Sequence, residues 1–392
     1  MGDPRLKSAA RELAARMVDW RRDLHRHPEI GFEEHRTAAF VERELGALGL
    51  DVETGVGQTG VIGVMRAEQA SSPPVLLRAD MDALPIQEIG GREYGSEVAG
   101  KMHACGHDGH VAMLLGAAHL LEQRRGDLSR DVVFCFQPAE EGQGGAQAML
   151  DAGVLERTGA SAAYALHLWS LFPVGTVHLR GGPIMAAQDE FTARFVGSGG
   201  HGALHHRAVD PLVAAAQGVT ALQTVVSRNV DPIEAAVVTV GVLQAGTAAN
   251  VIPGDARIAG TLRSFRADVR QILRDRVQEI LESVARGSGC TLEYELTQGF
   301  PAVVNDVDAT RRAGELAAGV VGAERVVETP PLAAAEDFAF FLERVPGAFI
   351  FVGAGNEQRG ITAPHHSPEF DIDETALPIG AELLASLALS ER

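Results

Sequence analysis

The run Val132-Val133-Phe134-Cys135-Phe136-Gln137-Pro138-Ala139-Glu140-Glu141-Gly142 decides the fold. Its first five residues are apolar and predict a short buried strand that ends just before two carboxylates. Similar apolar runs recur along the first half of the chain, and helical patterns separate them. This alternation indicates an α/β core with a mainly parallel or mixed sheet. The further strand predictions are Gly60–Arg66, Val75–Ala79 and Ala163–His167, and the helix predictions are Leu13–Leu24, Thr37–Leu48, Val111–Leu121 and Ala146–Leu150.

The pattern changes at Glu190, where strands and helices follow in the order β-α-β-β-α-β. That order is typical of a ferredoxin-like unit. The predicted elements are Phe191–Val196, Pro211–Val226, Ala236–Val242, Ala256–Arg263, Val269–Ala285 and Thr291–Thr297. Beyond Gly299 the alternation resumes with Thr310–Val320, Ala334–Arg344, Phe349–Gly353 and a final Ala/Leu-rich helix. We therefore expect a catalytic domain in two segments, residues 1–187 and 299–392, interrupted by a satellite domain over residues 188–298.

Composition excludes several classes of protein. The 392 residues carry a formal net charge of −18, and only Lys7 and Lys101 are lysines. Nucleic-acid binding needs clustered basic residues, so a nucleic-acid partner is not expected. No apolar run approaches the roughly 18 residues of a membrane span, and the charged N-terminal helix is unlike a signal sequence. The three cysteines form no paired framework, which together with these features predicts a cytoplasmic protein with reduced thiols.

Gly55-Val56-Gly57-Gln58-Thr59-Gly60 matches the dinucleotide-binding fingerprint, and Asp80 and Asp82 follow about 20 residues later. A dinucleotide loop runs from a strand into a helix, because the helix N-terminus binds the pyrophosphate. Here the glycines run into Val61-Ile62-Gly63-Val64-Met65, which reads as a strand. A turn between two strands is therefore the preferred interpretation, and an NAD-dependent oxidoreductase is kept as an alternative.

The densest site signal is Met102-His103-Ala104-Cys105-Gly106-His107-Asp108-Gly109-His110. In extended backbone, residues two apart point the same way, so Cys105 and His107 can converge on one metal ion. The alternative is a buried thiol with satisfied histidines. Asp108 is expected to cap the helix that follows.

Adjacent carboxylates after a buried strand also indicate a site, because one of them needs a cation or a proton. Of Glu140 and Glu141, one can bind metal while the other serves as a base, although a solvated loop remains possible. Single histidines follow comparable strands at His167 and at the pair His365-His366. Together these groups offer five to six ligands, enough for two metal ions. One thiol with a spare carboxylate is unlike a closed structural zinc site.

The ordered motifs resemble the amidohydrolase branch of the dinuclear metallopeptidase family, which includes N-acyl-amino-acid hydrolases, hippurate hydrolase and auxin–amino-acid conjugate hydrolases. The resemblance covers nearly the whole chain. The residues that carry it are Leu24–Glu29, Arg78–Pro85, Met102–His110, Gln137–Gly142, His167–Trp169, Gly200–Gly202, Asn250–Pro253, Ala335–Phe338 and His366–Pro368.

The resemblance implies a ligand set and a general base. The implied metal ligands are Cys105, His107, Glu141, His167 and His366, with Glu140 as the base. His366 is preferred over His365 because the family's ligand directly precedes the Ser/Asn-Pro pair. Related carboxypeptidases have His-x-Asp where this chain has Asp80-Met81-Asp82, so Asp82 is expected to support a ligand from behind rather than to bind metal.

The resemblance also assigns residues of the satellite domain. His201 is expected to reach a partner chain's site in a homodimer and to bind the carbonyl or oxyanion, while Asn250 and Arg263 hold the substrate carboxylate. From the sequence alone, His201 could equally be a loop histidine beside His205 and His206, and Arg263 a surface charge.

These observations predict an enzyme that hydrolyses the amide of small N-acyl or N-aroyl amino acids. Two divalent ions per chain are expected, with zinc or manganese favoured over cobalt or nickel. The alternatives are a dipeptidase or carboxypeptidase of the same family, the NAD enzyme, and a noncatalytic binding module that would tolerate loss of Glu140.

Overall fold

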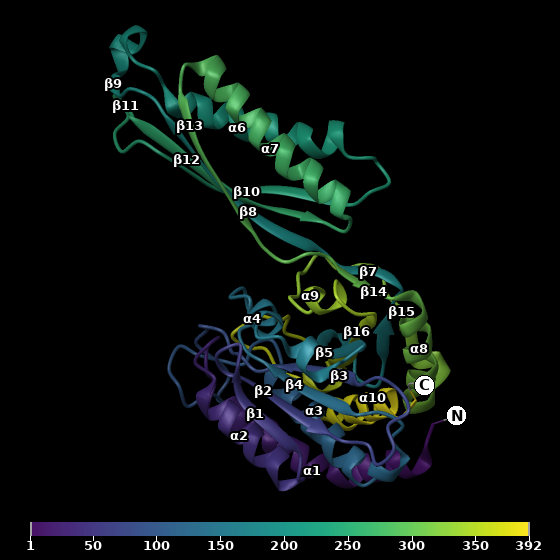
Figure 1. Cartoon of the computed structure of the whole chain (residues 1–392). Helices are drawn as coiled ribbons and strands as arrows, with labels where there is room; N and C mark the ends of the chain where they lie inside the picture. Colours follow the sequence, from purple (N-terminus) through teal and green to yellow (C-terminus); the bar gives the residue numbers. More distant parts are fainter. Residues whose placement is uncertain (1, 391–392) are drawn as a thin grey trace. The chain divides into compact units, whose positions relative to one another are not determined.

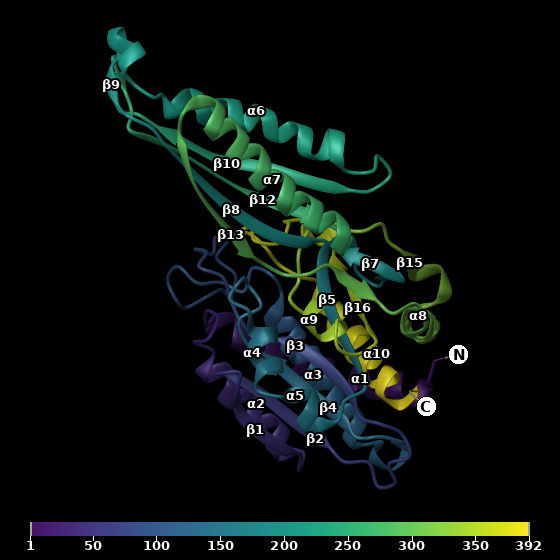
Figure 2. The same ribbon diagram turned by 45° about the horizontal axis from the view of Figure 1, so that its top comes forward.

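The computed structural model describes residues 2–390, which form two compact units. The larger unit comprises the chain up to residue 184, residues 304–330 and residues from 337 onward. The inserted unit comprises residues 185–303 and 331–336. Both units are drawn in Figure 1 and, turned, in Figure 2.

The larger unit is built on an eight-stranded mixed sheet with the strand order β1-β2-β4-β3-β5-β16-β6-β15. Four neighbouring strands in its middle, β4, β3, β5 and β16, run parallel to one another. Their carboxyl ends therefore meet at one edge of the sheet, where α/β proteins place their ligands. The strands are β1 (Asp51–Val56), β2 (Gly60–Met65), β3 (Val75–Asp80), β4 (Val132–Gln137), β5 (Ala162–Pro173), β6 (Val177–Leu179), β15 (Val326–Glu328) and β16 (Gly347–Gly355).

Helices cover both faces of this sheet, which confirms the α/β prediction. One face packs alternate strand residues such as Val75 and Leu77 against a continuous apolar core. The helices that contribute to this core are α1 (Pro4–Arg26), α2 (His35–Ala47), α3 (His107–Glu122), α8 (Val307–Val321) and α10 (Leu377–Ser390). On the opposite face, Cys135 of β4 contacts Met149 of α4 (Gly145–Asp151). Two shorter helices, α5 (Val154–Thr158) and α9 (Ala339–Leu342), complete this unit.

Local signals explain where the helices begin. The Asp3 side chain accepts hydrogen bonds from the N–H groups of Arg5 and Leu6, and Pro4 occupies the first helical position. Helix α1 therefore starts nine residues before the predicted Leu13. The predicted helix Ala334–Arg344 shrinks to α9, and the preceding Asp337 is instead hydrogen-bonded to side chains of the sheet.

The inserted unit contains a four-stranded antiparallel sheet with the order β10-β12-β8-β13. Two helices pack on one face of it and bury a separate apolar core. The elements follow in the order β8 (Ala187–Val196), α6 (Pro211–Asn229), β10 (Ala236–Ala245), β12 (Asp255–Ser264), α7 (Ala267–Ser288) and β13 (Thr291–Gln298). A small ribbon pairs β9 (Gly200–His201) with β11 (Val251–Ile252). A second ribbon pairs β7 (Gly182–Met185) with β14 (Val303–Asn305), where the chain passes between the larger and the inserted unit.

The glycine fingerprint lies in a hairpin. Strands β1 and β2 pair antiparallel, and the tight turn between them contains Gly57 and Gln58 at positive φ. No helix follows the glycines, so the helix N-terminus that a pyrophosphate requires is missing there. The interpretation as a turn is confirmed. Within residues 2–390, none of the helices combines the length and the apolar character that crossing a membrane would take.

Candidate metal centre

Neighbouring parallel strands bring the predicted ligands together. Asp82 follows β3, Glu140 and Glu141 follow β4, and His167 lies in β5. Because β3 lies between β4 and β5, these side chains gather at one edge of the sheet even though the sequence separates them widely.

The thiol and the first histidine converge at the start of α3. Gly106 has φ +90°, and this left-handed residue turns the chain into the helix that begins at His107. The expectation of extended backbone at His107 is therefore wrong, but the convergence it was used to explain is present. The Cys105 Sγ atom lies 3.6 Å from His167 Nε2. One potential ligand atom from each of Cys105, His107 and His167 lies within 4.8 Å of the others.

A second group shares the same thiol. Potential ligand atoms of Cys105, Glu141 and His366 also lie within 4.8 Å of one another. The His366 Nε2 atom is 3.1 Å from Glu141 Oε1. Two groups that share Cys105 offer enough potential ligands that these residues could hold two divalent ions.

The rings of His107 and His167 both direct their Nε2 atoms toward the cluster of potential ligands. The Nδ1 atom of His107 faces the carbonyl oxygen of Asp82 at 2.9 Å, and His167 Nδ1 faces the carbonyl oxygen of Leu168 at 2.8 Å. A carbonyl only accepts, so both rings carry a proton on Nδ1 and direct Nε2 toward the cluster. His107 Nε2 is buried and makes no hydrogen bond within the described part of the chain. This polar atom is what a metal ion would satisfy.

The two adjacent histidines have different environments. His365 Nε2 lies 3.0 Å from the Leu168 carbonyl, and its ring stacks on Trp169 with centroids 4.2 Å apart. His366 instead faces Glu141. The resemblance implies His366 rather than His365 as the ligand, and His366 is the one of the two that lies beside Glu141.

Asp82 supports the cluster from behind. Its Oδ1 atom is 3.1 Å from His107 Nδ1, and its Oδ2 accepts the Glu141 N–H at 2.9 Å. One buried carboxylate thus contacts two potential ligands, which is compatible with the expected role of Asp82 in orienting ligands.

Glu140 is 7% exposed, and its Oε1 accepts a long hydrogen bond of 3.4 Å from the Asp337 N–H. Potential ligand atoms of Glu140, Glu141 and His107 lie within 4.8 Å of one another. The neighbouring Ala139 has φ +53°, and His366 has φ +64°. Non-glycine residues in this conformation are strained, and such strain concentrates at functional sites.

The electrostatics of the cluster favour a cation. Burial, reinforced by Glu141 and Glu140, raises the pKa of the Cys105 thiol well above its usual range. Burial alone would lower the pKa of His107, but Asp80 and Asp82 raise it to about 10, so a metal ion that binds Nε2 would displace a proton from it. Burial lowers the pKa of His167, which keeps that imidazole neutral. The acidic side chains of Asp80, Asp82, Glu140 and Glu141 thus surround the cluster, and a divalent ion there would interact favourably with them.

A buried network that the sequence reasoning did not assign lies beneath the ligands. Arg78 contacts Asp80 at 2.5 Å and Asp337 at 2.9 Å. His110 Nε2 accepts the Leu168 N–H, and its Nδ1 lies 2.6 Å from Asp80. The network ties β3 to β5 beside His167. Its members lie within or next to quoted motifs, but only the fold shows that they meet.

Asp108 does not cap α3, contrary to expectation. It lies inside the helix, and its Oδ2 accepts from Arg21 Nε at 2.9 Å and lies 2.7 Å from His25 Nδ1. Arg21 and His25 belong to α1, so this buried carboxylate joins two helices. Burial of Arg21 and His25 with it makes this a long-range charge cluster rather than a local cap.

The inserted unit carries the remaining predicted residues. His201 pairs with Val251 across the β9–β11 ribbon, and Gly202 N–H donates to the Asn250 carbonyl at 2.9 Å. The Ala203 N–H donates to His201 Nδ1, so the neutral ring carries its proton on Nε2 and can donate. Arg263 lies near the opposite end of β12, where it pairs with Gln188 and donates to the Ala333 carbonyl. His201 and Asn250 therefore lie close to each other at the β9–β11 ribbon, whereas Arg263 lies near the far end of β12.

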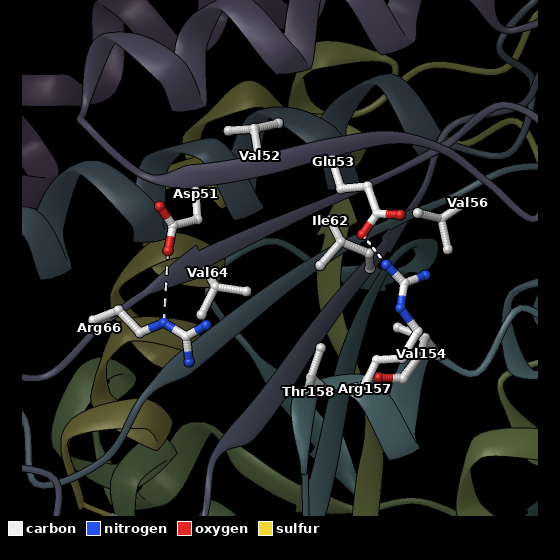
Figure 3. A pocket seen from close by; sticks show the side chains of 10 residues that line it. All are labelled: Asp51, Val52, Glu53, Val56, Ile62, Val64, Arg66, Val154, Arg157 and Thr158. Carbon is white, nitrogen blue, oxygen red and sulfur yellow. Dashed lines mark hydrogen bonds and ion pairs between the residues drawn. The ribbon is translucent and has the colours of Figure 1, made fainter.

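A surface hollow elsewhere in the larger unit has different chemistry. Figure 3 shows it between β1, β2 and α5, with an apolar floor and two ion pairs at its walls. Asp51 faces Arg66, and Glu53 faces Arg157. It is lined by neither histidine nor cysteine, so it lacks the donors of the candidate metal centre.

The chain is similar to known proteins over most of its length. Residues 76–390 match the model of peptidase family M20/M25/M40. IAA-amino acid hydrolase ILR1-like 5 of Arabidopsis thaliana is 42% identical over 376 residues, which cover 95% of this chain and 86% of that protein. Thermostable carboxypeptidase 1 of Saccharolobus solfataricus is 39% identical over 389 residues, covering 98% of each. The crystal structure of Bacillus subtilis YXEP protein, described as a dinuclear metal binding peptidase from M20 family, superposes with a TM-score of 0.84 at 36% identity and covers 97% of this chain and 98% of that one.

Proposed function

The chain belongs to peptidase family M20/M25/M40, and from that premise we propose that it is an amidohydrolase that cleaves N-acyl or N-aroyl amino acids into a carboxylic acid and an amino acid. The observation that carries the proposal is the pair of ligand groups that share Cys105, with the buried carboxylate of Glu140 beside them. The similarity to an IAA-amino acid hydrolase supports an amino-acid conjugate as the substrate class.

The donor set fits two divalent ions. We assign Cys105, His107, Glu141, His167 and His366 as ligands, with Asp82 orienting His107 and Glu141. Thiolate and imidazole suit zinc, while the carboxylate also suits manganese, so these two metals are favoured over cobalt and nickel. When bound, such ions supply Lewis acidity and make water a stronger acid.

Glu140 acts as the general base in this proposal. Its carboxylate takes a proton from the attacking water, whose oxygen forms a bond to the amide carbon. Glu140 then delivers that proton to the nitrogen as the carbon–nitrogen bond breaks, because an unprotonated amide anion is a poor leaving group. The same carboxylate thus serves both steps and ends unchanged.

The inserted unit provides binding groups. His201 Nε2–H donates to the oxyanion, and Asn250 and Arg263 bind the substrate carboxylate. Along β12, the eight residue steps from Asp255 to Arg263 span roughly 26 Å at about 3.3 Å per residue. In an N-acyl amino acid the amide carbonyl and the carboxylate are only a few bonds apart. One inserted unit therefore cannot supply both His201 and Arg263 to one substrate, which supports a homodimer with sites completed by the partner. A cytoplasmic location is part of the same proposal.

A carboxypeptidase or dipeptidase is the second candidate, because the chain is also similar to a thermostable carboxypeptidase. The two functions share the proposed chemistry and differ in the group on the acyl side of the scissile bond. The test is a panel of N-acetyl, N-benzoyl and indole-acyl amino acids alongside dipeptides, each assayed with added zinc, manganese, cobalt or nickel. Preference for dipeptides over every N-acyl amino acid would overturn the assignment.

A further inference from the structure

Glu34 is a fully buried carboxylate that lies outside the proposed ligand set. It immediately precedes α2, and its side chain is 0% exposed. Its Oε1 atom accepts the Ala139 N–H at 2.8 Å, and its Oε2 is 2.5 Å from the Thr59 hydroxyl. Three segments meet at this carboxylate: the start of α2, the turn between β1 and β2, and the loop that carries Glu140 and Glu141.

Ala139 is the residue that this contact restrains. It is buried, and its φ of +53° lies in the left-handed region that disfavours a side chain. Its carbonyl accepts the Gly145 N–H at 3.1 Å. A Cβ atom on Gly31 would approach the Cα and Cβ of Ala139 to 2.9 Å, so Gly31 allows close packing against it. The strained residue is thus held at its N–H, at its carbonyl and along its side chain.

We propose that Glu34 is a positioning residue: by accepting the Ala139 N–H it holds the loop in the conformation that aims Glu140 at the substrate and Glu141 at the metal centre, and Thr59 orients Glu34 for this task. The inference rests on the proposed function, since it concerns the alignment of that base. Glu140 adjoins Ala139 directly, so rotation of the Ala139 backbone moves its carboxylate.

The contact does not depend on a formal charge at Glu34. An ionised carboxylate accepts from both Ala139 and Thr59. A neutral side chain still accepts from Ala139 through Oε1 and can donate to the Thr59 hydroxyl, which is also an acceptor. A glutamine at position 34 therefore preserves both contacts, whereas a leucine of similar size removes both and leaves the Ala139 N–H buried without its acceptor.

The experiment compares Glu34→Leu, Glu34→Gln and Thr59→Val with the wild type. Glu33→Leu is the matched control, because Glu33 is the adjacent glutamate, its side chain is 64% exposed and it pairs with Lys101. The measurements are kcat and KM at saturating metal, bound metal per chain, the pH–rate profile, and hydrogen exchange of peptides covering residues 137–145.

We expect kcat of Glu34→Leu to fall about 100-fold, the loss typical of a misplaced catalytic group, with KM changed less than kcat. Glu34→Gln should stay within about threefold of the wild type and keep its pH–rate profile, Thr59→Val should lie between the two, and Glu33→Leu should match the wild type. Exchange in residues 137–145 should accelerate in Glu34→Leu and return to the wild-type rate in Glu34→Gln.

Three results would overturn the inference: equal kcat in Glu34→Leu and wild type, a loss in Glu34→Gln as large as in Glu34→Leu, or unchanged exchange of residues 137–145. If Glu34→Leu is poorly folded, Thr59→Val takes its place, and wild-type kcat together with wild-type exchange of residues 137–145 in Thr59→Val would then overturn the inference. A wild-type protein inactive on every N-acyl amino acid would instead refute the proposed function, and the exchange measurement would then test the Glu34 contact alone.

Discussion

A mixture of two inactive variants offers a direct test of the shared active site. His201→Ala removes the proposed oxyanion donor from the inserted unit, and Glu140→Ala removes the base from the larger unit. Each variant alone should be nearly inactive, because every site in a homodimer then lacks one of the two groups. After subunit exchange the two lesions can segregate into different sites.

The geometry of β12 sets the expected recovery. His201 lies beyond the Asp255 end of β12, and Arg263 lies roughly 26 Å along that strand, so under the proposed function one site takes His201 from one chain and Arg263 from the other. In a twofold dimer each His201 then serves the site that contains the partner's Glu140. Random pairing makes about half of the dimers heterodimers, and one of their two sites carries neither lesion. About a quarter of the wild-type activity per site should return.

The assay measures hydrolysis of an N-acyl amino acid before and after exchange, with differently tagged chains to count heterodimers. A mixture of Glu140→Ala with Glu140→Gln is the control, because it exchanges subunits without separating the lesions. No recovery despite measured heterodimers would show that each site uses its own His201 or none. The reasoning from β12 would then be wrong.

Four further predictions concern the general base, the metal ligands, the substrate contacts and Glu34. Glu140→Gln should lower kcat by several orders of magnitude while metal per chain stays near the wild-type value, and activity within tenfold of wild type would contradict its role. Cys105→Ala should lose bound metal as well as activity, whereas Cys290→Ser should lose neither; equal metal content in Cys105→Ala and wild type, measured by elemental analysis, would exclude the thiolate as a ligand. Arg263→Ala should raise KM for free acids far more than for the matching methyl esters, and equal loss for both would make Arg263 structural. Burial raises the pKa of Glu34 to about 7, above the ordinary 4.5, so between these pH values the folded state binds more protons than the unfolded state. The free energy of unfolding should therefore fall as pH rises through this range, and Glu34→Gln should flatten its pH dependence there. An unchanged pH dependence in Glu34→Gln would show that Glu34 does not titrate in this range.

Periodicity was enough to predict the strands that matter. Buried parallel strands such as β3 and β4 are short apolar runs that end in polar residues, and the signal for both is contained in six residues. The strand ends then locate Asp82 and Glu140 at one edge, because parallel strands share the direction in which they end. This part of the site follows from local sequence.

Long-range contacts could not be predicted in the same way. Asp108 is a residue type that often caps helices, and it stands close to the start of a helix. Its carboxylate instead contacts Arg21 and His25, which lie more than 80 residues earlier in the chain. A buried arginine makes such a pairing obligatory, since an uncompensated buried charge is costly. The pattern of neighbouring residues likewise predicts a helix at Asp337. It does not reveal the hydrogen bonds of Asp337 to Arg78 and Gln137, because those residues are distant in the sequence.

The choice between His365 and His366 shows what the fold adds to a motif. The two residues have the same side chain and adjacent positions, so residue type does not separate them. The backbone groups of Leu168 distinguish the two histidines, because they contact His365. The Leu168 carbonyl faces both His167 Nδ1 and His365 Nε2, and the Leu168 N–H donates to His110. His365 is thereby used to hold the segment in place.

The positive φ of His366 has a cause in the same contacts. Its N–H donates to the Ala104 carbonyl at 2.8 Å, which ties it to the residue before Cys105, while the ring of the preceding His365 stays on Trp169. With the backbone held at both points and φ at +64°, the His366 ring faces Glu141. Ala139, two residues before Glu141 in the chain, also has a positive φ, and its N–H donates to Glu34. Strain at two positions around one carboxylate persists because neighbouring hydrogen bonds hold both, and under the proposed function it would position Glu141 and His366 before a metal ion binds.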